Sequence, residues 1–356
     1  MVIPEYDDII MGQGLAGTAL AWRLRWRGHR ILVIDREVPI TSSKVAAGLM
    51  TPITGQRLVK SWRWDQFWPS ATAFYHRVEK ETGSIVFHPT CMVRLLANGS
   101  EQEFLGRRLT SEFQGLVTQP EPLVNPNWFD SCWSGFEMIE GGRLDVLAYL
   151  NTSRHNFTSE GQYIAADLAP DEDLVLTDCG VELPRLGLRS SRIIFCQGID
   201  AMSNSLFSDV RFKPAKGEIL TLRIEELPEE RIIHRGVWLM PLGSNLFRAG
   251  ATYEWKQLDC EPTTQGRDEI CARLREFLHL PFEVVGHDAA VRPIPRHQIP
   301  IVGLHPQHRQ LGFFNGLGSK GSLQSPWIAE HFAGYLAGEH PLDWELDLHR
   351  TLSLVK

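Results

Sequence analysis

The sequence lacks several features that would each mark a particular class of protein. No stretch approaches the ~20 consecutive apolar residues that a membrane-spanning helix needs, so we expect no membrane span. The six cysteines include no C-x-x-C pair and no spacing typical of a zinc site, so we expect no metal site. There is also no internal repeat and no low-complexity tract. A soluble globular protein is the class that remains.

The chain also lacks an excess of positive charge, since its formal net charge is −7 over 356 residues. This balance does not favour broad nucleic-acid binding, although a local basic patch stays open. The first apolar strand begins within a few residues of Met1, which leaves no room for a signal peptide. With the cysteine pattern, this predicts a cytoplasmic protein whose thiols are mostly buried. The length allows a sizeable core and two lobes.

The most informative stretch is residues 7–35, DDIIMGQGLAGTALAWRLRWRGHRILVID. A short apolar run at 9–11 is typical of a buried strand, and a helical pattern follows at about 15–27. Between them, Gly12, Gly14 and Gly17 have G-x-G-x-x-G spacing. A second apolar strand at 31–34 ends in Asp35. Strand, glycines, helix, strand and terminal acid in this order match the dinucleotide-binding fingerprint.

Each residue of this fingerprint has a physical role. Gly12 permits a tight turn, Gly14 allows the backbone to approach a pyrophosphate, and Gly17 allows helix and strand to pack closely. The helix N-terminus faces the phosphates, and Asp35 accepts hydrogen bonds from a ribose. The alternative is a glycine-rich turn that packs without a ligand.

Small and hydroxylated residues follow the second strand closely. They suit a chain that runs against a flat ring system and a phosphate, and the alternative is a surface loop leading into a helix. The residues are Ser42, Ser43, Ala46, Ala47 and Gly48.

A cluster of cationic and aromatic residues comes next. Such a cluster can line an anionic-substrate pocket or stack nucleobases, or it can be the half-buried face of a helix with solvated arginines. Its members are Arg57, Lys60, Trp62, Arg63, Trp64, Phe67 and Trp68.

The middle of the chain alternates between strand and helix patterns. We expect strands at 84–96, 174–181, 192–196, 217–223 and 237–253, the last two in an antiparallel sheet. We expect an inserted helix with loops at 98–126, and helices at 143–149 and 269–278.

A second glycine-rich turn lies far from the first in sequence. An apolar strand at 311–314 leads into Gly316, Gly318 and Gly321, and a helix is expected from about Ser325. Such a turn can present backbone N–H groups to a second part of the ligand. A flavin needs such donors, because negative charge develops at N1 and the C2 carbonyl on reduction. Two separated glycine turns therefore favour FAD over a nicotinamide cofactor.

Several ordered motifs resemble those of a known family. They are GQGLAGT with Asp35, SSKVAAGL, IFCQGID, KGEILTL, FRAGATYE, VRPIPRHQIPIVG and FNGLGSKGSLQSP. Over nearly its whole length the chain resembles the FAD-dependent D-amino-acid oxidase superfamily, which contains glycine oxidase, sarcosine oxidase and D-amino-acid dehydrogenases. The last motif is also similar to the oxidase domain of the bifunctional enzyme that modifies wobble uridine in tRNA, but we expect no room here for that enzyme's methyltransferase half.

The resemblance implies an α/β fold, α+β overall, with a Rossmann-like FAD-binding domain and an antiparallel-sheet substrate domain. The FAD-binding domain would comprise 1–60, 141–210 and 283–356, and the substrate-binding domain 61–140 and 211–282. The implied chemistry is oxidation of a C–N bond. Hydride passes from the carbon bearing the amine to flavin N5, and water hydrolyses the resulting imine. Nothing around Cys196 indicates a covalent flavin, so the implied FAD is non-covalent.

The resemblance also assigns site residues. The residues implied to bind FAD are Gly12, Gly14, Leu15, Ala16, Gly17, Asp35, Arg36, Ser42, Ser43, Lys44, Ala46, Ala47, Gly48, Leu49, Cys196, Gln197, Gly198, Arg292, Gly316, Gly318, Ser319, Lys320, Gly321 and Ser322. Those expected to contact the substrate are Met50, Arg57, Lys60, Tyr253 and Arg292.

Arg292 and Lys320 are the two residues expected to take part in catalysis. Arg292 falls where glycine oxidase-like members carry the arginine that grips a substrate carboxylate, and a guanidinium fork suits this bidentate contact. Lys320 lies where a cation could stabilise reduced flavin or superoxide. The alternatives are a surface arginine before Pro293 and a solvent-facing loop lysine.

We therefore predict an FAD-dependent amine or amino-acid oxidoreductase. The competing hypotheses are a tRNA wobble-uridine oxidase that uses Arg57, Lys60, Trp62, Arg63 and Trp64, a flavin-bound binding module without turnover, and a nicotinamide-dependent dehydrogenase. The sequence leaves open the substrate and its stereochemistry, the electron acceptor (oxygen or a quinone) and the oligomeric state.

Overall fold

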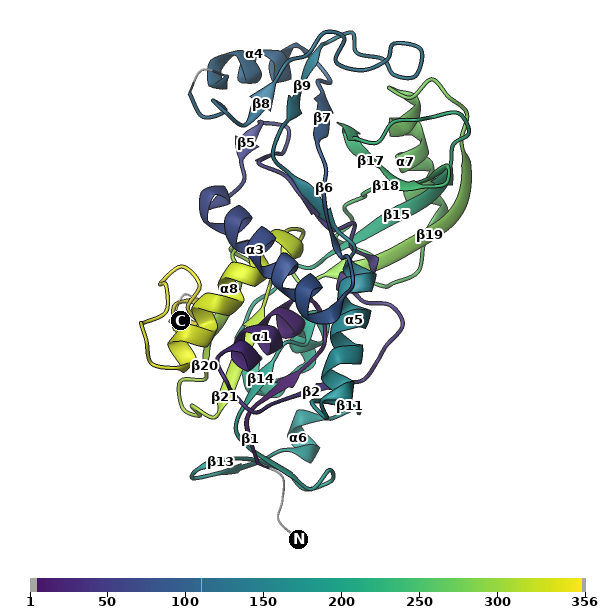
Figure 1. Cartoon of the computed structure of the whole chain (residues 1–356). Coiled ribbons are helices and arrows are strands. Elements are labelled where there is room, and N and C mark those ends of the chain that lie inside the picture. The colour runs from purple at the N-terminus through teal and green to yellow at the C-terminus, as the bar shows by residue number, and fades with distance from the viewer. Residues whose placement is uncertain (1–4, 110, 354–356) are drawn as a thin grey trace.

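Two sheets of eight strands each organise the structure. The computed structural model describes residues 5–109 and 111–353. In the view of Figure 1, strands such as β1, β2 and β14 of the first sheet lie in the lower half. Strands such as β15, β17 and β18 of the second sheet lie in the upper half. This mixed α/β architecture agrees with the predicted fold class.

The first sheet has a parallel centre in the order β11-β2-β1-β14-β21, to which β20 and the β12–β13 hairpin add antiparallel strands. Its strands are β1 (Glu5–Met11), β2 (Ile31–Asp35), β11 (Tyr163–Ala165), β12 (Val175–Thr177), β13 (Gly180–Leu183), β14 (Leu188–Phe195), β20 (Ile301–Leu304) and β21 (Leu311–Asn315). The predicted strand–helix–strand unit at the start of the chain is confirmed, because β1 and β2 pair in parallel around α1 (Leu15–Trp26).

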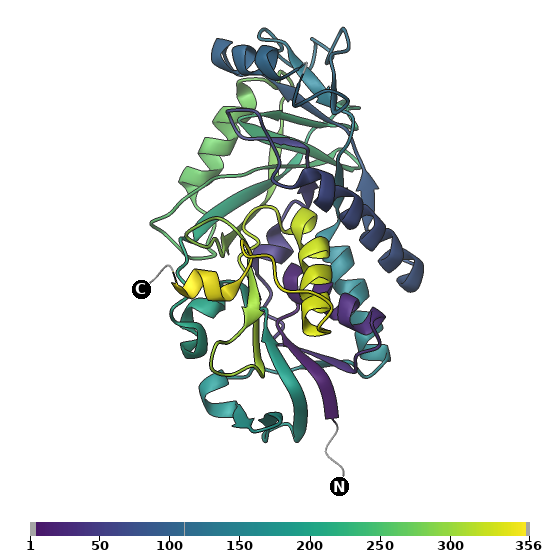
Figure 2. The same ribbon diagram turned by 90° about the vertical axis from the view of Figure 1, so that its left-hand side faces the viewer.

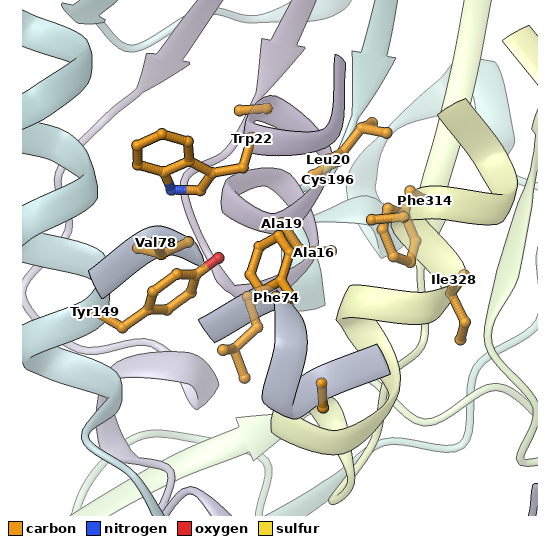
Figure 3. Close-up of a cluster of buried hydrophobic side chains, with 14 of the residues drawn as sticks. Ala16, Ala19, Leu20, Trp22, Phe74, Val78, Tyr149, Cys196, Phe314 and Ile328 are labelled. Carbon is orange, nitrogen blue, oxygen red and sulfur yellow. The ribbon is translucent and has the colours of Figure 1, made fainter. Parts of the chain in front are cut away.

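Helices from distant parts of the chain cover one face of this sheet. They are α1, α3 (Trp64–Thr82), α5 (Val146–Ser159) and α8 (Gly321–Leu336), and α3 lies beside α8 in both Figure 1 and Figure 2. Their apolar faces meet in one core, where Trp22, Phe74 and Tyr149 lie close together in Figure 3. The indole Nε1 of Trp22 donates a 2.9 Å hydrogen bond to Ser153 Oγ, so this ring is buried without a lost hydrogen bond.

The second sheet has the order β19-β15-β18-β17-β16-β7-β9-β8, and its neighbours are antiparallel except for the parallel pair β16 and β7. Its strands are β7 (Met92–Leu95), β8 (Val117–Thr118), β9 (Gly135–Met138), β15 (Ala215–Arg223), β16 (Ile232–Arg235), β17 (Val237–Gly243), β18 (Leu246–Gly250) and β19 (Glu283–Arg292). The predicted antiparallel sheet over 217–223 and 237–253 is thereby confirmed, although the second range is the β17–β18 hairpin rather than one strand.

The two faces of the second sheet differ in character, because successive side chains of a strand point to opposite faces. One face packs against α7 (Thr264–Arg275) in an apolar core that includes Val93, Leu220, Ile233, Leu239 and Ala249. The residues adjacent to these in sequence point to the other face and line a cavity. They are Arg94, Ile219, His234, Trp238 and Gly250. The second sheet therefore separates its apolar core from this cavity.

Shorter elements complete the fold. They are the helices α2 (Ser42–Val45), α4 (Gly99–Arg108), α6 (Pro170–Asp173) and α9 (Leu348–Ser353), the strands β3 (Leu49–Met50), β4 (Ile53–Thr54), β5 (Val59–Lys60), β6 (Phe87–Pro89) and β10 (Gly142–Leu144), and the 3₁₀ helices η1 (Gly198–Ser203) and η2 (Ser205–Phe207). Within residues 5–109 and 111–353, every helix is too short or too polar to span a bilayer.

Several predicted boundaries are wrong for identifiable reasons. The range 143–149 combines the end of β10 with the start of α5, which begins after Asp145 caps the amide of Ala148. The range 174–181 is a hairpin, β12 and β13, rather than one strand. The helix predicted at 269–278 begins earlier, at Thr264, because Thr263 caps the amide of Gly266. The predicted strand at 84–96 is divided into β6 and β7.

The cysteines also differ from expectation. All six lie in the described residues and all are free, but only Cys196 and Cys271 are buried. Cys132 and Cys179 are exposed, and the other two are intermediate. The expectation that most thiols fill the core is therefore wrong.

Candidate functional site

A cavity of about 960 Å³ lies where the two sheets meet. The carboxyl ends of the parallel strands open into it, through Met11, Asp35, Cys196 and Asn315. Ligands of open α/β sheets bind outside the carboxyl ends of the strands, and ligand pockets generally measure ~300–1,000 Å³. Both the position and the size of the cavity therefore suit a large ligand.

The first glycine turn has no room for side chains. Gly12 has a φ of +106°, and a Cβ atom there would lie 2.5 Å from the carbonyl oxygen of Cys196. A Cβ atom on Gly17 would lie 1.9 Å from the carbonyl oxygen of Gly12, and one on Gly14 would lie 2.9 Å from Ser43 Oγ. The backbone of β1, the turn and α1 is consequently packed closely, and the start of α1 faces the cavity.

Asp35 is oriented by this turn. Its Oδ2 accepts a 2.7 Å hydrogen bond from the backbone N–H of Gln13, and its Oδ1 accepts a 2.8 Å bond from that of Glu37. A carboxylate has about four lone-pair sites, so each oxygen can accept a further donor. Asp35 lines the cavity and is therefore able to bind two hydroxyl groups of a ligand.

The segment after β2 follows the cavity wall as expected for a cofactor contact. The predicted residues that line the cavity here are Ser42, Ser43, Lys44, Ala46, Ala47, Gly48 and Leu49. Thr41 caps α2 by accepting the amide of Lys44, and Gly48 has a φ of +75° at a point where a Cβ would lie 1.9 Å from the carbonyl oxygen of Leu144. Burial lowers the pKa of the Lys44 ammonium.

The second glycine turn reaches the same cavity from the carboxyl end of β21. Gly318, Ser319, Lys320, Gly321 and Ser322 line it. Helix α8 begins at Gly321, and its N-cap residue Lys320 makes no side-chain capping bond to the first amides. The positive end of the helix dipole is thus directed at the cavity. Burial lowers the pKa of Lys320 from its ordinary value of 10.5 to about 8, so its ammonium is still mostly charged at pH 7.

Arg292 ends β19 inside the cavity. Its guanidinium lies 4.5 Å from the centre of the Tyr253 ring and donates a 3.4 Å hydrogen bond to the carbonyl oxygen of Thr252. In the part of the chain that the structure describes, no carboxylate pairs with this guanidinium. Burial lowers its pKa, which means that its charge is incompletely solvated. An anionic group would supply the missing counter-charge.

Gly217 makes room for this arginine. A Cβ atom on Gly217 would lie 2.0 Å from Nη2 of Arg292 and 2.3 Å from its Cζ. The guanidinium is therefore stacked directly over the backbone of β15.

Five predicted site residues do not line the cavity. Gly17 and Gly316 act through close backbone packing, since a Cβ atom on Gly316 would lie 2.3 Å from Pro295 Cγ. Met50 is fully buried in the core and does not line the cavity, which argues against the expected contact with substrate. Arg57 is exposed at the tip of the β4–β5 hairpin, and Lys60 is paired with Asp65 at 2.7 Å.

The aromatic and cationic cluster at 57–68 is divided between the β4–β5 hairpin with the turn after it, which holds Arg57, Lys60, Trp62 and Arg63, and the start of α3, which holds Trp64, Phe67 and Trp68. Trp64 is buried and stacks on Trp68, so neither face of the Trp64 indole is open to a base. Arg63 is paired with Asp343 at 2.6 Å and with Glu345 at 2.5 Å. Of the two interpretations of this cluster, packing with satisfied arginines is the one that the structure supports.

The remaining predicted residues lie together in the cavity, namely Gly12, Gly14, Leu15, Ala16, Asp35, Arg36, Cys196, Gln197, Gly198, Tyr253 and Arg292 in addition to those above. Sequence reasoning missed Arg94, Gly217, His234 and Trp238, which line the same cavity. The alternation of apolar residues along β7, β16 and β17 was the available signal, because it places these side chains opposite the core. Among the described residues, no group of His, Cys, Asp and Glu side chains is arranged to hold a metal ion.

Comparison with known proteins assigns the chain to a family. Residues 7–335 match the model of a family described as FAD dependent oxidoreductase. The tRNA 5-methylaminomethyl-2-thiouridine biosynthesis bifunctional protein MnmC of Marinobacter nauticus is 24% identical over 91% of this chain, and the match covers 54% of that protein. This chain therefore spans about half the length of that relative.

Two further comparisons extend over both chains. Glycine oxidase of Bacillus licheniformis is 22% identical, and the match covers 94% of each chain. The crystal structure of glycine oxidase from Geobacillus kaustophilus superposes with a TM-score of 0.78 at 19% identity, and the match covers 95% of this chain and 96% of that one. At this identity the structural likeness establishes the fold.

Proposed function

Because the chain belongs to the FAD-dependent oxidoreductase family, we propose that its cavity binds FAD non-covalently and that the enzyme oxidises the C–N bond of an amino acid or related amine. The observation that carries the proposal is Arg292, a half-buried guanidinium without a carboxylate partner in the described chain, facing the cavity that both glycine turns enter. The names of relatives such as glycine oxidase favour the same substrate class.

The residues of the cavity fit FAD. The first glycine turn and the start of α1 suit the pyrophosphate, and the free lone pairs of Asp35 suit the adenosine ribose. The uncapped first turn of α8, with Lys320, offers N–H donors and a positive charge to the pyrimidine edge of the flavin. Cys196 favours non-covalent binding, because burial raises the pKa of its thiol and keeps it from acting as a nucleophile.

Arg292 is placed to bind the carboxylate of the substrate. The Thr252 carbonyl and the Tyr253 ring hold the guanidinium in one orientation, and Gly217 lets it approach β15 closely. A planar guanidinium fixed in this way forms a bidentate contact, which positions the rest of the substrate without further reorganisation.

When bound, FAD supplies the oxidising chemistry, since its N5 atom accepts the hydride from the carbon that carries the amine nitrogen. The protein's own task is then to orient the substrate and to remove water from around it. Arg292 fixes one end of the substrate, while Ile219 and Trp238 form an apolar part of the cavity wall beside it. Lys320 keeps a positive charge in the cavity at neutral pH. Water hydrolyses the imine product.

The division into domains follows the same proposal. We assign FAD binding to 1–60, 141–210 and 283–356, and substrate binding to 61–140 and 211–282. The strands support this division, since the first sheet draws on the former segments and the second sheet mainly on the latter. Three elements cross it, because α3 packs in the core of α1 and α8, β6 pairs with β10, and β19 pairs with β15.

The test is an absorption spectrum of the purified protein followed by anaerobic titration with amines and amino acids. We expect oxidised-flavin bands that a carboxylate-bearing amine bleaches, and that oxygen or a quinone restores. Arg292→Met should abolish bleaching while it retains the flavin bands, and Arg292→Lys should weaken it. A protein without flavin after reconstitution with FAD would contradict the proposal.

The same titration examines a tRNA-borne amine, the alternative suggested by the 24% identical relative. The packing of Trp64 and the ion pairs of Arg63 argue against two of the contacts expected for tRNA. Bleaching by tRNA but by no free amine would favour that alternative.

A further inference from the structure

A single row of residues crosses the cavity face of the second sheet. Arg94, His234, Trp238, Gly250 and Ile219 are direct cross-strand neighbours on β7, β16, β17, β18 and β15. All five line the cavity. The side chains of the row are polar at the Arg94 end and apolar toward β15.

The polar end of the row is a fixed hydrogen-bond chain. Arg94 and Glu101 form a buried ion pair of 2.8 Å, and Glu101 also accepts a 3.0 Å bond from the backbone N–H of Ala97. Nη1 of Arg94 lies closer to Nδ1 of His234 than to Nε2, which is 3.4 Å away, so we assign Nδ1 as the acceptor of the guanidinium N–H. Since a guanidinium has donors only, this Nδ1 carries no proton.

His234 is therefore a neutral imidazole whose proton is on Nε2. Burial holds its pKa well below the ordinary range, and the positive charges of Arg94 and Lys320 lower it further. The ring thus presents one N–H donor, with its tautomer set by Arg94, beside a cavity that also contains Lys320.

The opposite end of the cavity face is the Arg292 guanidinium, which lies over Gly217 on β15. Three strand spacings separate β15 from β16, and Gly217 lies two residues along β15 from Ile219, so the guanidinium and His234 are roughly 16 Å apart. Between them, a Cβ atom on Gly250 would lie 3.0 Å from Cζ2 of Trp238, which means that the indole edge reaches over this glycine. The middle of the row is flat and apolar.

We propose that His234 determines specificity by donating its Nε2–H to a hydrogen-bond acceptor at the far end of an extended substrate. Arg292 binds the carboxylate of this substrate, and Trp238 packs against its apolar middle. The substrate class is an amino acid with a long substituent that ends in a carboxylate or carbonyl oxygen. Allowing for a hydrogen bond at each end, the terminal oxygens are roughly 10 Å apart. The inference rests on the proposed function at the Arg292 end.

The experiment uses two ethers that cannot be oxidised as amines, 4-carboxybenzyloxyacetate and benzyloxyacetate. They differ only in the distal carboxylate, and their dissociation constants for the purified holoenzyme are measured by calorimetry. We expect the first to bind about tenfold more tightly to the wild-type protein. His234→Phe should remove this preference, while His279→Phe, a change at an exposed histidine outside the cavity, should retain it.

His234→Gln guards against a folding defect, because glutamine offers an acceptor to Arg94 and a donor to the ligand. It should retain part of the preference that His234→Phe loses. Equal affinity of both ethers for the wild type, or an unchanged preference in His234→Phe, would overturn the inference. Arg292→Met tests the proposed function separately, since it should abolish binding of benzyloxyacetate, and the flavin bands report FAD independently of either ether.

Discussion

The hydroxyl group of Tyr75 on α3 donates a 2.7 Å hydrogen bond to the backbone carbonyl of Ser322 in the first turn of α8. In a regular helix this carbonyl accepts the N–H four residues later, but that residue is Pro326, which has no N–H. Tyr75 therefore supplies the donor that the proline lacks. The bond stabilises the start of α8, from which Gly321 and Ser322 enter the cavity.

Tyr75→Phe should lower the free energy of unfolding by about 1–3 kcal/mol, because it leaves the buried Ser322 carbonyl without this donor. Urea denaturation measures the change. In a Pro326→Ala background the restored N–H of residue 326 can bond to Ser322, so the same substitution should cost less. An equal cost in both backgrounds would show that Tyr75 does not compensate for the proline.

This relationship also explains a limit of the sequence-based prediction. The sequence pattern predicts a helix start near Ser325, one residue before Pro326. The structure starts α8 at Gly321 instead, with Pro326 in the helix. The residue that makes this possible is Tyr75, which is 247 positions away in sequence. No local pattern contains that information.

The cofactor side of the site was more predictable than the substrate side. The first glycine turn with Asp35 is a local motif, in which spacing alone indicates the backbone geometry. The cavity face of the second sheet depends instead on strand register. His234 and Arg94 are neighbours only because β16 pairs with β7 in parallel, across 140 positions. The prediction for Met50 fails in the opposite way. Met50 directly follows the cofactor segment in sequence, but its side chain is buried in the core and does not reach the cavity.

Gly217→Ala should displace Arg292, because the added Cβ would lie 2.0 Å from Nη2 of its guanidinium. We expect KM for a carboxylate-bearing substrate to rise about tenfold or more while flavin content is unchanged, since one charge-assisted contact is weakened. Steady-state kinetics measure the effect. The control is Gly106→Ala on α4, where a Cβ meets no atom within 4 Å. A KM equal to that of the wild type would show that Arg292 does not bind the substrate.

Lys320 should make the stability of the apoprotein depend on pH. Its pKa in the folded state is about 8, compared with its ordinary value of 10.5, because burial disfavours the ammonium. The unfolded chain therefore binds more protons between these values, and stability rises as pH increases from about 8 to 10.5. Lys320→Met should lack this rise and should be more stable than the wild type at pH 7.

The free energies of unfolding of the FAD-free wild type and of FAD-free Lys320→Met are measured with denaturant at several pH values. Their difference at each pH is the contribution of Lys320. Lys80→Met, at an exposed position on α3, is the matched control and should follow the wild-type profile. A Lys320→Met difference that is constant from pH 7 to 11 would show that the ammonium is not destabilised by the cavity.

Asp35→Asn should weaken FAD binding, since the Asp35 carboxylate both organises the first glycine turn and offers lone pairs to the ribose. Its two oxygens accept the N–H groups of Gln13 and Glu37 at 2.7 and 2.8 Å. An asparagine has only one acceptor oxygen, so its amide group must face one of these N–H donors. We expect the dissociation constant of FAD to rise about tenfold to hundredfold, measured by calorimetry on the apoprotein.

The control is Asp178→Asn, at an exposed turn outside the cavity, which should leave the dissociation constant of FAD unchanged. Equal constants for Asp35→Asn and the wild type would mean that this carboxylate serves the turn alone and that the ribose is held elsewhere.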